Sequence, residues 1–128
     1  MSLQDLVASI NHLKTIPESI GNLTKLKNLA LHKNLLTSVP VTLGNLVNLE
    51  VLSLHTNFLT NLPGSIGNLS NLINLRLEKN KLKTLPKEMT HLKNLRSFWI
   101  SKNRFTTLPE YIENWIKELE SYQCKIQR

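Results

Sequence analysis

Residues 49–71 read LEVLSLHTNFLTNLPGSIGNLSN, and the rest of the 128-residue chain repeats this stretch with variations. Five full copies follow one another at a spacing of 23 residues, over residues 3–25, 26–48, 49–71, 72–94 and 95–117, and a partial copy or cap occupies residues 118–128. Two residue types keep this spacing in every full copy, at Asn11, Asn34, Asn57, Asn80, Asn103 and at Pro17, Pro40, Pro63, Pro86, Pro109. We therefore expect residues 1–128 to form a single domain built from a repeated unit.

Each copy contains a short alternation of apolar and variable residues, such as Leu52-Ser53-Leu54. A period of two puts alternate side chains on opposite faces of a strand. Because each strand recurs only after 23 residues, the connections are long enough for crossovers, and the strands are expected to lie in parallel. The repeated Asn is expected to hydrogen-bond the backbone where the chain leaves the strand. The repeated Pro and the IGNL-type segment after it favour a 3₁₀ turn.

The consensus LxxLxLxxNxLxxLPxxIGNLxx resembles the leucine-rich-repeat family over essentially the whole chain, and its LPxxIGNL half is similar to repeats of short spirochaete proteins and of plant intracellular proteins. The resemblance implies an α/β solenoid with a short curved parallel β-sheet on the concave side and turns or 3₁₀ segments on the convex side. It also implies non-catalytic protein binding through the concave face and its rim, in a bacterial protein with a host or envelope partner. A self-assembling structural protein and a regulatory subunit of an intracellular enzyme remain as alternatives.

The amino-acid composition and the motifs that are missing make some classes of function less favoured than others. With 16 Lys plus Arg against 9 Asp plus Glu, the net charge of +7 favours a partner with an acidic surface. The single cysteine, Cys124, excludes a disulfide framework. No catalytic set or phosphate-binding glycine loop is present, so neither an enzyme nor a cofactor is expected. The chain shows no signal peptide and no stretch of membrane-spanning length; the family resemblance implies a secreted or cell-surface protein, with the cytoplasm as the alternative.

The two ends depart from the consensus. Ala8 replaces a strand leucine in the first copy, which predicts a loosely packed N-terminal edge strand that could pair with another chain. In the fifth copy, residues 110–119 (EYIENWIKEL) predict a short amphipathic helix, with Trp115 covering the convex core rather than marking a ligand site. A final strand is then expected. Its inward residues are Leu119, Tyr122 and Cys124, and its outward residue beside Trp99 is Gln123. Cys124 is expected in the core, with a reactive thiol as the alternative.

Candidate binding residues lie in the outward strand positions. Trp99 is the most prominent, because an outward aromatic on the concave face exposes apolar area that binding would use. The alternative is that Trp99 lies over its neighbour Arg76 and only covers the sheet, and a cation–π contact between the two suits either interpretation. The fourth and fifth copies carry net charges of +4 and +2, and their cations on or near this face include Arg76, Lys79 and Lys102, with Lys81 and Arg104 on the rim. Either an acidic partner or a solvated face explains this charge; nucleic acid is disfavoured, since one Trp is a poor stacking platform.

A second column holds His32, His55 and Glu78 on successive strands. Two His and a carboxylate are a known ligand set for zinc, but a flat column lacks an enclosing geometry, so no dedicated metal site is expected and these three remain weak candidates. On the rim, Leu35 and Phe58 replace residues that are usually polar and lie side by side. They form either a contact site or a local cover for the turn.

Overall fold

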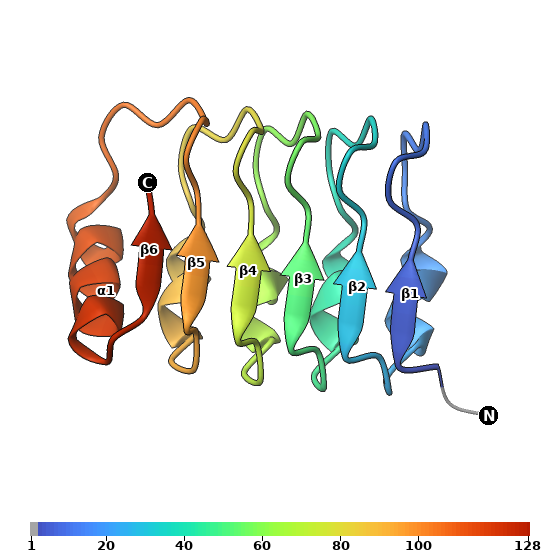
Figure 1. The fold of residues 1–128 in the computed structure, drawn as a ribbon, viewed down its shortest axis with the longest axis horizontal. Coiled ribbons are helices and arrows are strands. Elements are labelled where there is room, and N and C mark those ends of the chain that lie inside the picture. Colours follow the sequence, from blue (N-terminus) through green and yellow to red (C-terminus); the bar gives the residue numbers. More distant parts are fainter. Residues whose placement is uncertain (1–2) are drawn as a thin grey trace.

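The computed structural model describes residues 3–128, which form one open sheet of six parallel strands. The strands follow one another in chain order (Figure 1): β1 (Asp5–Val7), β2 (Asn28–Ala30), β3 (Val51–Ser53), β4 (Asn74–Arg76), β5 (Ser97–Trp99) and β6 (Lys125–Gln127). Leu29 pairs with Leu52, and Leu52 pairs with Leu75, so the sequence repeat becomes a buried row of leucines across the sheet. The predicted parallel architecture is confirmed.

A row of 3₁₀ turns lies behind the sheet: η1 (Glu18–Asn22), η2 (Val41–Asn45), η3 (Gly64–Asn68) and η4 (Lys87–His91). Each begins directly after a proline with φ between −65° and −71°, which proline adopts without strain. Within η3, the Ile66 N–H donates to the carbonyl of Pro63 at 3.2 Å, the three-residue spacing of a 3₁₀ turn. The prediction of 3₁₀ segments after the prolines is also confirmed.

Glycine in the IGNL segment allows neighbouring turns to stack closely. A Cβ atom on Gly67 would overlap the carbonyl oxygen of Glu88 in η4, and a Cβ atom on Gly44 would lie 2.5 Å from the carbonyl oxygen of Ser65 in η3. In the fourth copy this position is Thr90, and the element packed beyond η4 is a helix instead of another 3₁₀ turn. The glycine is therefore needed only where two 3₁₀ turns pack side by side.

The helix α1 (Glu110–Ser121) closes the C-terminal end, as residues 110–119 predicted. Its apolar side chains recur with helical spacing on the buried face, at Ile112, Trp115, Ile116 and Leu119. Trp115 packs its ring 5.2 Å from that of Phe98, and its Nε1–H donates to the carbonyl of Leu92 at 2.9 Å. Trp115 thus covers the end of the core, as expected.

The predicted register of the last strand is wrong. β6 begins only at Lys125, and Gln127 rather than Gln123 lies beside Trp99. Leu119 belongs to α1, and Tyr122 is 68% exposed after the helix ends. The cause is the length of the helix: α1 has 12 residues where a 3₁₀ turn has 5, so the chain returns to the sheet later than the repeat spacing requires.

Two other expectations for the ends, a buried Cys124 and a loosely packed first strand, are confirmed. Cys124 is buried, and burial raises the pKa of its thiol, so it behaves as a core residue. At the β1 edge, Leu6 and Ala8 are only half-buried, whereas the equivalent Leu29 and Leu31 of the second copy are fully enclosed. The first strand is therefore the loosely packed end of the core.

One asparagine per copy satisfies the backbone at the bend after each strand. The Asn57 Nδ2 donates to the carbonyls of Leu54 and Leu31 at 3.1 and 3.0 Å, and its Oδ1 accepts the N–H of Leu36 at 3.0 Å. Two of these three groups belong to the preceding copy, so the amide joins neighbouring copies as well as closing its own bend. Asn34, Asn80 and Asn103 make the same bonds.

Replacing Asn57 by alanine should therefore lower the free energy of unfolding by about 2–4 kcal/mol, because three backbone groups lose their partner in a buried setting. Asn11 makes bonds only within its own exposed bend, and Asn11→Ala should cost less than about 1 kcal/mol. Urea denaturation followed by circular dichroism measures both. Equal losses in the two variants would show that the contacts to the preceding copy contribute nothing.

Candidate binding surface

The outward side chains of the strands form one row across the concave face of the sheet. Strand pairing aligns Val7, Ala30, Ser53, Arg76, Trp99 and Gln127 in this row. Its first half is small or aliphatic, and its second half carries long polar or aromatic side chains. The alternation predicted from the sequence places Arg76 and Trp99 next to each other, on β4 and β5.

Arg76 and Trp99 stack on one another. The Arg76 Cζ lies 4.5 Å from the centroid of the Trp99 ring, a cation–π distance. The Trp99 Nε1–H donates to Ser97 Oγ at 3.0 Å, and the side chain is half-buried. The indole is therefore held in one orientation by its own strand and by its neighbour, while part of it still faces the solvent.

Glu78 lies beneath this pair and is buried, although the sequence placed it in an outward column. Its side chain is held by Arg76, whose Nε donates to Oε1 at 2.8 Å and whose Nη2 contacts the same oxygen. Glu78 is 4% exposed, and its second oxygen, Oε2, has no hydrogen-bond partner among residues 3–128. A fixed carboxylate thus lies under the guanidinium at the base of the concave face.

The two histidines extend the same cluster toward the first copy. The His32 and His55 rings stack with centroids 4.4 Å apart and planes 8° from parallel. Ser9 Oγ lies 3.0 Å from His32 Nδ1, and His55 Nδ1 lies 3.8 Å from Glu78 Oε1. Burial, with the charge of Arg76, lowers the pKa of His55 to about 4, while Glu78 partly opposes the shift. Burial also lowers the pKa of His32.

This arrangement does not suit a metal ion. Parallel stacking holds the His32 and His55 rings face to face, so their nitrogens do not converge on one point, and Arg76 occupies one oxygen of Glu78. No group of three or more His, Cys, Asp or Glu side chains in the described part of the chain has the geometry of a metal site.

A hollow of about 430 Å³ opens beside the Arg76–Trp99 pair, and we call it the basic hollow. Its cationic side chains are Lys33, Arg76, Lys79 and Lys102, and its floor includes His55 and Glu78. The remaining lining comes from Thr56, Trp99, Ser101 and Gln127. Six of the nine predicted partner-binding residues therefore line one concavity, and all its cations come from the second, fourth and fifth copies.

The three lysines of the basic hollow occupy the residue before the repeated asparagine, where the backbone is left-handed. Their φ angles are 58° at Lys33, 59° at Lys79 and 56° at Lys102. This conformation is unusual for residues other than glycine, and the asparagine amide that closes the bend maintains it. The alternation of strand residues does not predict this conformation; its signal in the sequence is the fixed position directly before each asparagine.

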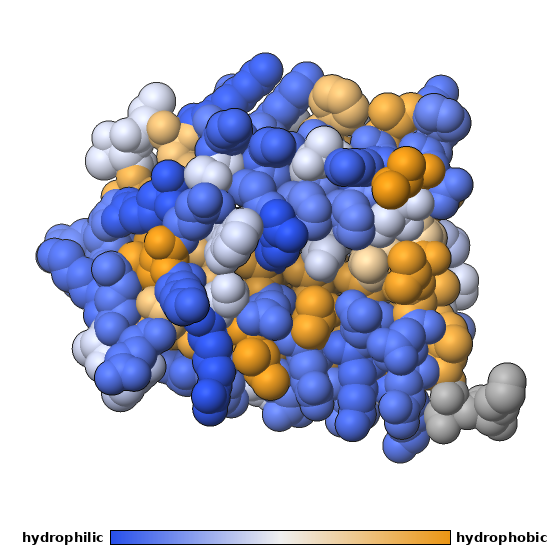
Figure 2. All heavy atoms as spheres, in the orientation of Figure 1, coloured by the Kyte–Doolittle hydropathy of each residue, from blue (hydrophilic) through white to orange (hydrophobic). Residues whose placement is uncertain are grey.

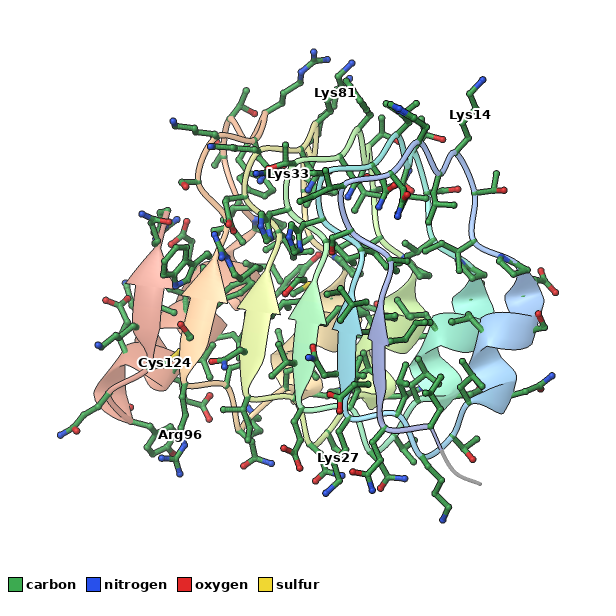
Figure 3. All side chains as sticks on the ribbon, turned by 45° about the vertical axis from the view of Figure 1, so that its right-hand side comes forward. Lys14, Lys27, Lys33, Lys81, Arg96 and Cys124 are labelled. Atoms are coloured by element: carbon green, nitrogen blue, oxygen red, sulfur yellow. The ribbon has the colours of Figure 1, made fainter. Side chains whose placement is uncertain are left out.

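On the rim, Leu35 is half-buried and Phe58 is 41% exposed. The Lys81 Nζ lies 4.8 Å from the centroid of the Phe58 ring, so a cation from the next copy covers part of this apolar patch. Figure 3 shows Lys33 and Lys81 at the edge of the sheet where the strands end, with Lys27 and Arg96 at the opposite edge. Figure 2 shows hydrophobic surface gathered at the β1 end, where Val7 and Ile10 are exposed.

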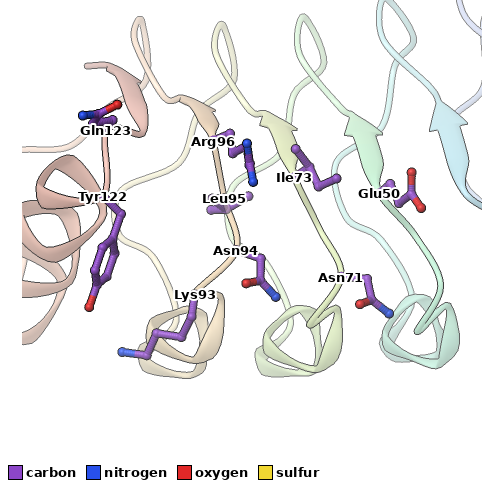
Figure 4. A pocket seen from close by; sticks show the side chains of 9 residues that line it. All are labelled: Glu50, Asn71, Ile73, Lys93, Asn94, Leu95, Arg96, Tyr122 and Gln123. Atoms are coloured by element: carbon purple, nitrogen blue, oxygen red, sulfur yellow. The ribbon is translucent and has the colours of Figure 1, made fainter.

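A second hollow of about 570 Å³, larger than the basic hollow, lies at the edge where the strands begin (Figure 4). It contains none of the predicted site residues. Its charged lining mixes Glu50 with Lys93 and Arg96, and Lys93 is paired with Glu118 at 3.2 Å. No buried polar side chain without a partner faces this hollow among residues 3–128. It therefore lacks the concentrated charge of the basic hollow.

No helix in the described part of the chain is long and apolar enough to cross a membrane.

The lowered pKa of His55 predicts a pH-dependent stability. The unfolded chain binds a proton near pH 6.5 and the folded protein only near pH 4, so the stabilisation is complete above pH 6.5 and is lost as the pH falls toward 4. His55→Gln should remove roughly 1–3 kcal/mol of the difference in unfolding free energy between pH 7 and pH 4.5. His12→Gln, at an exposed histidine of the first copy, should leave that difference intact. If the unfolding free energy depends on pH identically in His55→Gln and the wild type, the pKa of His55 is not the cause of the pH dependence.

Comparison with known proteins agrees with this architecture. A sequence model described as leucine rich repeat matches residues 47–105. No curated protein sequence matches the chain.

Solved structures match closely. A leucine-rich-repeat protein of Leptospira interrogans is 37% identical with a TM-score of 0.85, over 96% of this chain and 30% of that one. The leucine-rich-repeat ectodomain of the Arabidopsis thaliana receptor kinase SOBIR1 is 32% identical with a TM-score of 0.79, over 95% of this chain and 67% of that one. A chain of the Toll–Spatzle complex of Drosophila is 36% identical with a TM-score of 0.77, over 83% of this chain and 14% of that one. This chain thus spans only about a third of the Leptospira protein, and it belongs to the leucine-rich-repeat family.

Proposed function

We propose that this protein binds a protein partner through its concave face and adjoining rim and performs no catalysis on it. The observation that carries the proposal is the Arg76–Trp99 stack, which presents an oriented, partly exposed indole beside a concavity. Trp and Arg are the residue types that most often dominate binding energy at protein interfaces. The basic hollow supports a partner with an acidic surface.

The family supports the same class of function. Leucine-rich-repeat domains generally mediate protein–protein interactions and are typically not catalytic. One of the similar structures is a complex of Toll with Spatzle. The similarity to the Leptospira protein supports the narrower proposal of a bacterial protein that acts on a host or envelope partner.

Trp99→Ala should weaken binding of this partner by at least ~2 kcal/mol, which is the scale of an interface hot spot. Its thermal unfolding midpoint should stay nearly unchanged, since the indole is only half-buried. The partner is first isolated by affinity capture from host and bacterial lysates with mass spectrometry, and the affinity is then measured by calorimetric titration.

Tyr122→Ala is the matched control, because Tyr122 is an aromatic side chain exposed away from the concave face. This variant should bind like the wild type. If Trp99→Ala also binds like the wild type, the concave face is not the binding surface.

Self-association is a second candidate function, favoured by the open edge of β1. Within residues 3–128 this strand pairs only with β2, and apolar side chains are exposed beside it: Leu3 at 44%, Val7 at 70% and Ile10 at 71%. Such an edge is a template for pairing with a strand of another chain.

Self-association through β1 predicts a concentration-dependent dimer in sedimentation equilibrium. Val7→Lys combined with Ile10→Lys should keep the protein monomeric, because charged side chains block the pairing of exposed edges. A wild-type protein that stays monomeric at high concentration would eliminate this candidate.

A further inference from the structure

The charges around the basic hollow are unbalanced. Four cationic side chains, Lys33, Arg76, Lys79 and Lys102, face one carboxylate, Glu78. Arg76 is paired with Glu78, whereas the three lysines form no ion pair with any of residues 3–128. His55 adds no charge near neutral pH, since its pKa is lowered to about 4. The hollow therefore attracts an anionic group.

The floor of the basic hollow requires a hydrogen-bond donor, in addition to the negative charge that the cations attract. Glu78 Oε2 and His55 Nδ1 are buried atoms without hydrogen-bond partners among residues 3–128, in residues that are 4% and 9% exposed. A carboxylate oxygen only accepts hydrogen bonds, and a buried acceptor without a partner costs about 1–3 kcal/mol. A ligand that fits this floor has to bring an N–H or O–H donor as well as a negative charge.

We propose that the basic hollow takes one Asp or Glu side chain of an extended segment of a partner protein. The carboxylate lies among Lys79, Lys102 and the free edge of the Arg76 guanidinium, and a neighbouring backbone N–H of the segment donates to Glu78 Oε2. This inference rests on the proposed function and names the chemical feature that the concave face recognises. A peptide supplies the anion and the donor a few ångströms apart, and a volume of about 430 Å³ accommodates a side chain with its backbone.

Nucleic acid and free phosphate fit less well. Arg76 already covers one face of Trp99, and Trp99 is the only aromatic ring besides His55 that lines the hollow, so base stacking has little surface to use. A bare anion satisfies the lysines but offers no donor to Glu78, whose own charge then repels it. The combination of a basic wall and an acceptor floor favours an acidic peptide.

The experiment uses the full chain and two-dimensional NMR with the peptide acetyl-Gly-Ser-Glu-Glu-Ser-Gly-amide. Of the two indole N–H signals, that of Trp99 should shift on titration, while that of Trp115, buried against Leu92, serves as an internal control. The same peptide with Gln in place of Glu should bind at least about tenfold more weakly, because it lacks the charge. Inorganic phosphate should not displace the Glu peptide at equal concentration.

Two substitutions test the two halves of the site. Lys79→Gln with Lys102→Gln should weaken binding of the Glu peptide at least about tenfold, whereas the same charge change at the exposed Lys14 and Lys25 should have little effect. Glu78→Gln is the more decisive test, because a purely electrostatic anion site and the proposed site predict opposite changes in peptide affinity. Removing a negative charge strengthens a purely electrostatic anion site, but here Arg76 keeps the amide oxygen and the amide NH₂ then faces the N–H of the ligand. Glu78→Gln should therefore weaken binding of the Glu peptide and strengthen binding of phosphate.

Several outcomes would overturn the inference: no Trp99 shift up to about 10 mM Glu peptide, equal binding of the Gln peptide or of phosphate, or tighter peptide binding by Glu78→Gln. Melting temperatures of all variants show whether a loss of binding is a loss of folding. If the captured partner depends on Trp99 but not on Lys79 and Lys102, the inference fails while the proposed function stands. If the peptide binds as described and the partner is indifferent to Trp99, the proposed function fails instead.

Discussion

The fold depends on one repeated interaction, the hydrogen bonds of a buried asparagine side-chain amide. In the second to fifth copies, the side chain of one asparagine bonds two backbone carbonyls and one N–H at the bends that follow the strands. The same amide keeps the preceding residue in a left-handed conformation, which fixes where that side chain projects. Three lysines occupy this position, so the group that stabilises the fold also sets the charged rim of the concave face.

Most of the fold could be predicted from the sequence, because the constraints act at fixed spacing. Alternation defined the strands, proline defined the start of each 3₁₀ turn, and the helical pattern of residues 110–119 defined α1. The register of β6 could not be predicted in the same way. It depends on how many residues the chain uses in passing from the end of α1 back to the sheet, and that number is set by packing against η4 and β5, which no repeat consensus encodes.

The candidate site was predicted in part. The sequence correctly aligned Arg76 beside Trp99 and His32 beside His55, since strand register alone decides these neighbours. It assigned Glu78 and His55 to an outward column and so to solvent, but the structure buries both. The Arg76 side chain bonds Glu78 while stacking on Trp99, and the ring of His32 stacks on that of His55. These contacts depend on side-chain rotamers, which the spacing of residues in the sequence does not determine.

The asparagine bonds between copies have a consequence for how this protein changes length. Each amide of the second to fifth copies serves its own bend and the bend before it, at a separation of one repeat. Removing or inserting 23 residues shifts every later amide onto an equivalent partner, whereas an indel between a strand and its asparagine leaves that amide out of phase with both bends. Gain or loss of a whole unit therefore preserves these bonds, and a partner surface can lengthen without redesign of the interior.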